Sequence, residues 1–160
     1  TDRVCVVGAG SYLAELEACP AQVDVCDMRP VYDLMGFRVG EHGIERHPSH
    51  IVFYDDPAQT ADLLSQADVV FLTGSMLVNG SFFELMPACA HAREVMLFGP
   101  SAGAPFEALM ELGVTCVTGT HVLDPEAFMD SVARRREGRP KPGEAVSPLC
   151  ESYAVTFPRS

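Results

Sequence analysis

Short apolar runs rich in β-branched residues alternate along the chain with segments of helical pattern. The runs with the length and composition of strands are Arg3–Val7, Gln22–Asp27, His50–Tyr54, Asp68–Thr73, Glu94–Phe98 and Val114–Thr118. Several are apolar at consecutive positions, which is typical of parallel strands covered on both faces. Strands that alternate with helices form βαβ units. The pattern therefore predicts an α/β fold with a doubly wound, mostly parallel, Rossmann-like sheet and helices on both faces.

Residues that favour the start of a helix occur at three places between the predicted strands or after the last of them. Asp56 followed by Pro57 combines an N-cap residue with a proline at the first helical position, and Asp124 with Pro125 repeats the combination. Ser81 followed by Glu84 has the spacing of a capping box. We expect helices to begin at these three places.

Two stretches interrupt the pattern and set the expected organisation. Residues 28–49 show neither period and form a long insertion in a Rossmann-like domain over residues 1–136. Residues 137–148, rich in Pro and Gly, are expected to be a linker. Residues 149–160 form a tail in which Tyr153–Phe157 alternates like a half-exposed strand, either a sheet edge or a swapped arm. We therefore expect a homo-oligomer or a partner domain. Because the sequence opens at Thr1, directly before a strand, it is expected to be a piece of a longer protein.

Composition narrows the class of function. The chain has 160 residues, 48% of them hydrophobic, which fits one domain with a buried core. Its 22 acidic and 11 basic residues give a net charge of −11, which argues against binding to nucleic acid or to an anionic membrane. No apolar run approaches the ~20 residues that span a bilayer, and no signal peptide opens the chain. A cytoplasmic location is expected.

The 6 cysteines do not have the spacing of a zinc or redox site. Cys5, Cys26 and Cys116 lie within apolar strand-like runs, whereas Cys19 and Cys89 lie in helical stretches. We expect buried free thiols in a reducing compartment rather than a disulfide framework.

The loops that leave the strands are rich in small and hydroxyl-bearing residues. In a doubly wound sheet such loops share one edge, where ligands bind near the reversal of strand order. Glycine permits close approach of a ligand, and hydroxyl and N–H groups suit an anion. The candidate ligand-binding residues are Gly8, Gly10, Ser11, Tyr12, Thr73, Gly74, Ser75, Asn79, Gly80, Ser81, Gly99, Pro100, Ser101, Gly119, His121 and Asp124. We place the ligand between the first and the fourth of the strand-exit loops.

A nucleotide cofactor is an alternative ligand. Gly8-x-Gly10 follows a strand, and Asp27 ends the next strand where an acid would bind a ribose. The third position of the dinucleotide fingerprint, however, holds Leu13, which would push the helix off the sheet. The sequence shows no nucleophile elbow or phosphate-binding loop of the Walker type, so no catalytic residue is assigned. An enzyme subunit that uses NAD or S-adenosylmethionine remains the alternative.

The insertion carries a group of potential metal ligands. His42, His47 and His50 lie near Asp33, Glu41 and Glu45, a density of imidazole and carboxylate that could hold a transition metal. The alternative is a solvated acidic loop, which the lack of a His-x-x-x-His pair on a helix favours.

Several blocks together resemble a known family. They are Ala67–Ser75, Val78–Ser81, Leu97–Ser101, Glu111–Val114 and Gly119–Asp124. Over residues 3–135 the chain is similar to the Rossmann-like domain of the family named for putative heavy-metal chelation. The resemblance implies a ligand site shared with a preceding enolase-N-terminal-like domain.

The strand-exit loops themselves offer few strong metal ligands besides His121 and Asp124. Soft metals prefer thiolate and imidazole groups, whereas hydroxyls and amides suit an anionic organic molecule. We therefore expect a binding domain for a small anionic ligand or a metal chelate, linked to heavy-metal handling.

Overall fold

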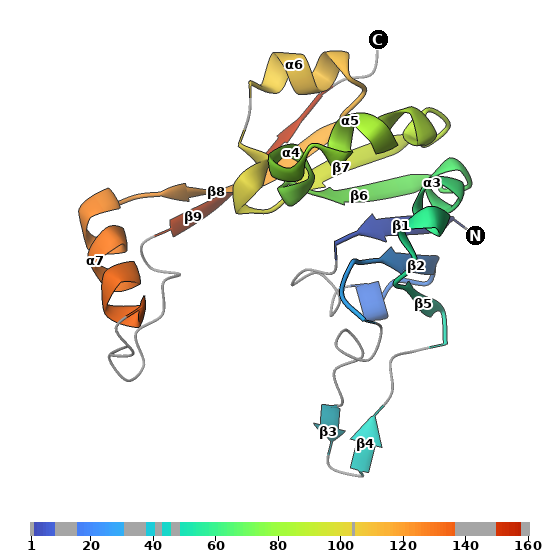
Figure 1. Ribbon diagram of the computed structural model, residues 1–160, viewed down its shortest axis with the longest axis horizontal. Helices are drawn as coiled ribbons and strands as arrows, with labels where there is room; N and C mark the ends of the chain where they lie inside the picture. The colour runs from blue at the N-terminus through green and yellow to red at the C-terminus, as the bar shows by residue number, and fades with distance from the viewer. Residues whose placement is uncertain are drawn as a thin grey trace.

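A computed structural model describes residues 2–8, 16–30, 38–40, 43–45, 49–103, 105–136 and 150–157. Its main feature is a seven-stranded sheet of order β5-β2-β1-β6-β7-β8-β9 (Figure 1). The strands are β1 (Arg3–Val7), β2 (Gln22–Cys26), β5 (Ile51–Tyr54), β6 (Val69–Thr73), β7 (Glu94–Phe98), β8 (Cys116–Val122) and β9 (Cys150–Thr156). All neighbouring pairs are parallel except β8 and β9. The α/β fold with a doubly wound, mostly parallel sheet is confirmed.

The strand order reverses between β1 and β6. From β1 the chain proceeds outward to β2 and β5, then returns to β6 and proceeds in the opposite direction to β7 and β8. The chain therefore continues in opposite directions along the sheet from the carboxyl ends of β1 and β6. Open α/β sheets bind ligands in the crevice beside two such strand ends.

The described helices mostly cover one face of this sheet. They are α3 (Pro57–Ser65), α4 (Ser75–Asn79), α5 (Ser81–Leu85), α6 (Phe106–Glu111) and α7 (Pro125–Arg136), with short 3-10 turns η1 (Met86–Cys89) and η2 (Pro100–Ala102). Leu64 of α3, Phe82 of α5 and Leu109 of α6 join Val70 and Leu72 of β6 in one buried cluster. Helix α7 lies apart from the others, at the far end of β8 and β9 (Figure 1). No helix in the described ranges has the length and apolar character to cross a bilayer.

The opposite face of the sheet has its own apolar cluster. Val4, Val6, Val23 and Val25 alternate with the residues of the first cluster and pack with Leu16. Both faces of β1 and β2 are therefore buried. The consecutive apolar residues of β1 predict this, whereas β2 also buries Asp24.

All three predicted helix starts are confirmed, and two of them have the expected side-chain cap. The Asp56 side chain accepts a hydrogen bond from the Ala58 N–H at 3.0 Å, and Asp124 accepts one from the Ala127 N–H at 3.0 Å. The capping box at Ser81 is wrong, because α5 starts after Gly80 in a left-handed conformation. The side-chain oxygen of Asn79 accepts hydrogen bonds from both the N–H and the hydroxyl of Ser81, and it takes the place of the expected cap.

The insertion contains structure that its lack of period did not predict. β3 (Arg38–Gly40) and β4 (Gly43–Glu45) form an antiparallel hairpin, which lies apart from the large sheet (Figure 1). The rest of the insertion from residue 31 to 48, and the expected linker over residues 137–148, lie outside the described residues.

The tail is an edge strand of its own sheet. β9 pairs with β8 from Cys116↔Thr156 to Val122↔Cys150. This pairing overturns one expectation, that Gly119–Asp124 is a strand-exit loop, because β8 continues as a strand as far as Val122. Hydrogen bonds to β9 extend β8 beyond the apolar run Val114–Thr118.

Candidate functional site

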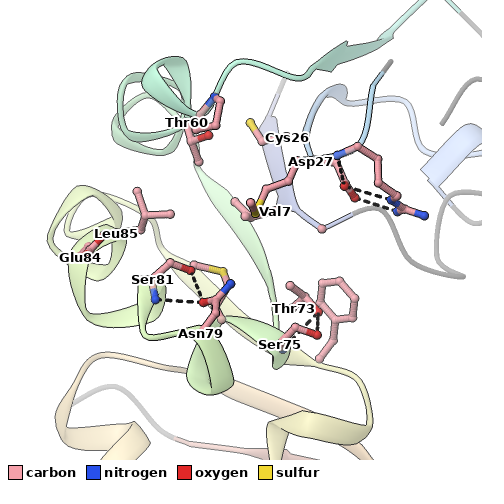
Figure 2. Close-up of a pocket in the computed structure, with 16 residues that line it drawn as sticks. Val7, Cys26, Asp27, Thr60, Thr73, Ser75, Asn79, Ser81, Glu84 and Leu85 are labelled. Atoms are coloured by element: carbon pink, nitrogen blue, oxygen red, sulfur yellow. Dashed lines mark hydrogen bonds and ion pairs between the residues drawn. The ribbon is translucent and has the colours of Figure 1, made fainter. Parts of the chain in front are cut away.

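A crevice of about 460 Å³ opens at the point where the strand order reverses (Figure 2). It is bounded by the carboxyl ends of β1, β2 and β6 and by residues of α3, α4 and α5. Its volume is within the range of small-molecule sites, roughly 300–1,000 Å³.

Gly8 and Thr73 line the crevice where the ends of β1 and β6 approach each other. Gly8 has φ +87°, and a Cβ there would lie 2.6 Å from Cγ2 of Thr73. Its N–H donates to the carbonyl of Cys26 at 2.8 Å. The glycine is therefore needed for the turn itself and for the close approach of the two strand ends.

Hydroxyl and amide groups form one wall. The N–H of Ser75 donates to the hydroxyl oxygen of Thr73 at 3.4 Å, and the hydroxyl of Ser81 donates to Asn79 at 2.8 Å. These local bonds fix the positions of four polar side chains along the wall (Figure 2).

Asp27 and Arg29 form a bidentate ion pair at the rim. Nε of Arg29 donates to Oδ1 of Asp27 at 3.0 Å, and Nη2 donates to Oδ2 at 2.8 Å. Both oxygens of Asp27 thus bind the guanidinium, which competes with the ribose contact expected of this acid. Arg29 was not a candidate in the sequence, although the Asp-x-Arg spacing makes such a local pair possible.

Two cysteines of neighbouring strands lie in the same apolar cluster. Cys26, the last residue of β2, lines the crevice, and Cys5 of β1 is fully buried. Interaction with the Cys5 thiol lowers the pKa of Cys26, and interaction with Cys26, followed by burial, raises the pKa of Cys5. Burial also raises the pKa of the neighbouring Cys89 thiol to about 11. All six cysteines are free. Four are buried as expected, whereas Cys19 and Cys150 are half-buried.

Two positions before Cys26, on the same face of β2, lies a buried carboxylate. Asp24 in β2 is 3% exposed; its Oδ2 accepts from Arg3 at 3.0 Å and its Oδ1 from the Tyr54 hydroxyl at 3.3 Å. Burial and the nearby Asp24 raise the pKa of Tyr54. A single Asp in the run Val23–Val25 is the only sequence signal for this cluster.

The structure brings only part of the candidate set to the crevice. Its described lining contains Gly8, Asp27, Thr73, Ser75, Asn79 and Ser81. It does not contain Gly74, Gly80, Gly99, Pro100, Ser101, Gly119, His121 or Asp124. Gly10, Ser11 and Tyr12 lie outside the described residues.

Several residues away from the crevice have structural contacts instead. Gly74 lies against the backbone of Ser101, 2.5 Å from where its Cβ would be. His121 is exposed on β8 opposite Glu151, and Asp124 caps α7.

The histidines of the insertion are not assembled in the described part of the chain. His50 precedes β5, at the end of that strand remote from the crevice, and its Nε2 lies 3.3 Å from the carbonyl of Leu16. His42 and His47 lie outside the described residues. Among the residues that are described, no group of three or more His, Cys, Asp or Glu side chains is placed to hold a metal ion.

A doubly wound sheet with a crevice at its reversal defines the class, a Rossmann-like α/β domain. Residues 1–139 match the family DUF364, described as "Putative heavy-metal chelation", and the chain belongs to this family.

Two solved structures of that family are similar. One, of unknown function, is from Desulfitobacterium hafniense: TM-score 0.70, 18% identity, covering 98% of this chain and 53% of that one. The other, also of unknown function, is from Pyrococcus horikoshii, with TM-score 0.70 and 16% identity, covering 98% of this chain and 55% of that one. The chain thus spans little more than half the length of these relatives. No curated protein matches it significantly.

Proposed function

We propose that the crevice binds a small anionic organic molecule as its metal chelate, and that the domain thereby takes part in heavy-metal handling. The observation that carries the proposal is the lining itself. It presents hydroxyl and amide groups from Thr73, Ser75, Asn79 and Ser81 at the strand-order reversal, and the described residues contain no three-ligand metal cluster. Such groups bind the oxygens of an organic ligand, and that ligand would hold the metal.

The charge of the lining favours a chelate over a free anion. The charged side chains of the described lining are Asp27, Arg29 and Glu84, one more acid than base. The chain as a whole carries a net charge of −11. Both repel a free anion, whereas a bound cation offsets the charge of its organic ligand.

The second half of the site is proposed to come from another domain. This chain covers 53% and 55% of the two solved relatives, and the family resemblance implies a preceding enolase-N-terminal-like domain. A crevice at a sheet edge can be closed by a neighbouring domain, because ligand sites occur preferentially at domain interfaces.

A nucleotide-dependent enzyme subunit is the second candidate. The tight turn at Gly8, with φ +87°, is what favours it, since a dinucleotide-binding loop needs such a glycine. The ion pair of Asp27 with Arg29 opposes it, because it occupies the acid that would bind the ribose.

Thermal shift and calorimetric titration distinguish the chelate-binding domain from the nucleotide-dependent enzyme subunit. The ligands are Ni(II)–citrate, citrate alone, Ni(II) alone, NAD and S-adenosylmethionine. We expect Ni(II)–citrate to stabilise the protein, by about 2.7 kcal/mol at ~100 times its dissociation constant. Stabilisation by NAD or S-adenosylmethionine but not by the chelate would contradict the proposal.

A pair of serine variants locates the site. Ser75 and Ser101 are both exposed in strand-exit segments, but only Ser75 lines the crevice. We expect Ser75→Leu to fill the crevice and abolish Ni(II)–citrate binding, and Ser101→Leu to retain it. Equal binding by both variants would place the ligand elsewhere.

A further inference from the structure

A second hollow, of about 840 Å³, lies beside the amino ends of β7 and β8 and is called the amino-end groove below. One wall consists of α5 and η1, and the other consists of α6 and the turn that follows it. Val114 and Thr115, which directly precede β8, line the groove and are buried. The crevice opens at the opposite, carboxyl ends of the strands, so the two sites are separate.

The walls of the amino-end groove expose large apolar side chains. Phe83 of α5 is 62% exposed, and Met110 and Leu112 at the end of α6 are each 43% exposed. The two walls approach each other at Met86, whose Cε lies 3.8 Å from where a Cβ on Gly113 would be. A cluster of exposed apolar side chains marks an interaction site, and unbranched Met side chains adapt to the shape of a partner.

Carboxylates accompany these apolar side chains. Glu111 of α6 lines the groove, and Glu107 lies one turn earlier on the same side of that helix. Glu94, at the start of β7, accepts a hydrogen bond at 2.7 Å from the hydroxyl of the lining residue Thr115. The described lining contains no Lys or Arg. The groove is therefore apolar with an acidic border.

We propose that the amino-end groove binds an amphipathic helix of a partner protein, one that carries basic residues beside its apolar face. Amphipathic helices dock in this way by inserting apolar side chains spaced three or four residues apart. Glu107 and Glu111 are four residues apart, about 6 Å along the helix axis, which matches two Lys or Arg residues at the same spacing on a facing helix. The inference goes beyond the chelate function, because it concerns a different edge of the sheet.

Charge disfavours the other occupants of such a groove. A second copy of this chain carries the same net charge of −11, and an anionic lipid surface is also negative, so the carboxylates repel both. Arg93, next to Glu94, donates to both carboxylate oxygens of Asp2, at 3.0 and 2.6 Å, and its charge is already paired. A basic helix is attracted by the border and covers the apolar side chains between its acids.

The test is fluorescence anisotropy of the full chain with a labelled designed peptide of about 18 residues, in which Leu recurs at helical spacing and Lys flanks it. One matched peptide has Glu in place of every Lys, and another has the Leu–Lys composition in scrambled order. We expect the Leu–Lys helix to bind at least about tenfold more tightly than either. Its affinity should fall at about 0.5 M salt, because exposed charges are screened there.

A matched pair of charge variants locates the binding surface. Glu111→Lys reverses a charge at the groove and should weaken binding of the Leu–Lys peptide by about tenfold. Asp62→Lys makes the same change in net charge at an exposed position of α3 and should retain the affinity. The comparison separates binding in the groove from unspecific attraction of a cationic peptide to an acidic protein.

A second pair tests the apolar contribution without changing the charge. Phe83→Ser combined with Met110→Ser removes an exposed apolar side chain from each wall and should weaken binding by about tenfold. Val78→Ser combined with Met129→Ser removes two exposed apolar side chains outside the groove, 79% and 64% exposed, and should leave binding unchanged.

Near-UV circular dichroism checks that each variant folds; if the Phe83 and Met110 double variant does not, Glu111→Lys and its control decide alone. The proposal is overturned by equal binding of the Leu–Lys and scrambled peptides, or by equal losses in Glu111→Lys and Asp62→Lys. It is also overturned if light scattering shows a dimer that the double variant dissociates, since a second copy then covers the groove. Ser75→Leu should retain the peptide while losing Ni(II)–citrate, so the failure of one proposal is distinguishable from the failure of the other.

Discussion

The ring of Tyr153 in β9 lies over the backbone of Gly119, its direct partner in β8. A Cβ on Gly119 would sit 2.5 Å from Cζ of Tyr153. The ring extends from there to Phe106 of α6, with centroids 6.2 Å apart and planes at 70°. A glycine predicted to admit a ligand instead admits an aromatic ring, which joins the tail strand to α6.

Gly119→Ala is expected to destabilise the fold by about 1–3 kcal/mol, the usual cost of overpacking. The added methyl group must displace the Tyr153 ring from Phe106. Urea unfolding measures the effect. Gly103→Ala is the control, because its Cβ would have nothing closer than 3.9 Å. In a Tyr153→Ala background the Gly119→Ala penalty should disappear, and simple additivity would refute the steric explanation.

Asn79→Ala is expected to cost about 1 kcal/mol, the typical value for loss of a helix cap. The Asn79 side chain accepts from the Ser81 N–H at 3.0 Å at the start of α5. Asn79→Asp keeps an acceptor there and should retain most of the stability. Val78→Ala, at a neighbouring residue 79% exposed, serves as the control in the same chemical denaturation. A stable Asn79→Ala would mean that the cap contributes nothing.

Tyr54→Phe is expected to destabilise the protein by about 1 kcal/mol through the lost hydrogen bond to Asp24. Asp24→Asn should cost more, about 1–3 kcal/mol, because Asp24 is buried and also binds Arg3. A double-mutant cycle by urea unfolding should show coupling between the two changes, since both alter the same contact. Independent effects would show that the 3.3 Å contact is not energetically significant.

Alkaline pH should destabilise the fold through Cys89. Its pKa is raised from 9.0 to about 11, so the folded state keeps the thiol neutral while the unfolded chain ionises. The stabilising contribution is therefore complete below pH 9 and is lost as the pH rises to about 11. At about 1.4 kcal/mol per unit, it amounts to no more than about 3 kcal/mol.

Free energies of unfolding measured from pH 8 upward test this. In Cys89→Ala the decline above pH 9 should be shallower than in the parent. Leu109→Ala, which removes a buried side chain of α6 that cannot titrate, should follow the slope of the parent. Parallel curves for the parent and Cys89→Ala would contradict the assignment.

The sheet and the position of the crevice follow from the local pattern of the sequence. The β-branched runs are long enough to specify β1, β2, β5, β6 and β7 locally, because most of the residues that these strands bury are apolar. Parallel strands place their carboxyl ends on one edge, so Gly8, Thr73 and Ser75 meet there whatever the details of packing.

The contacts between distant segments depend on tertiary packing and cannot be read from the local sequence pattern. The stretch after Thr118 is a strand because β9, some thirty residues later, supplies its hydrogen bonds. Cys5 and Cys26 lie on the same face because of the register of β1 on β2, and a slip of one residue would turn one of them to the opposite face. Register depends on the packing of both faces and not on local pattern, so this shared face was not predicted from the sequence, although both cysteines were correctly expected to be buried.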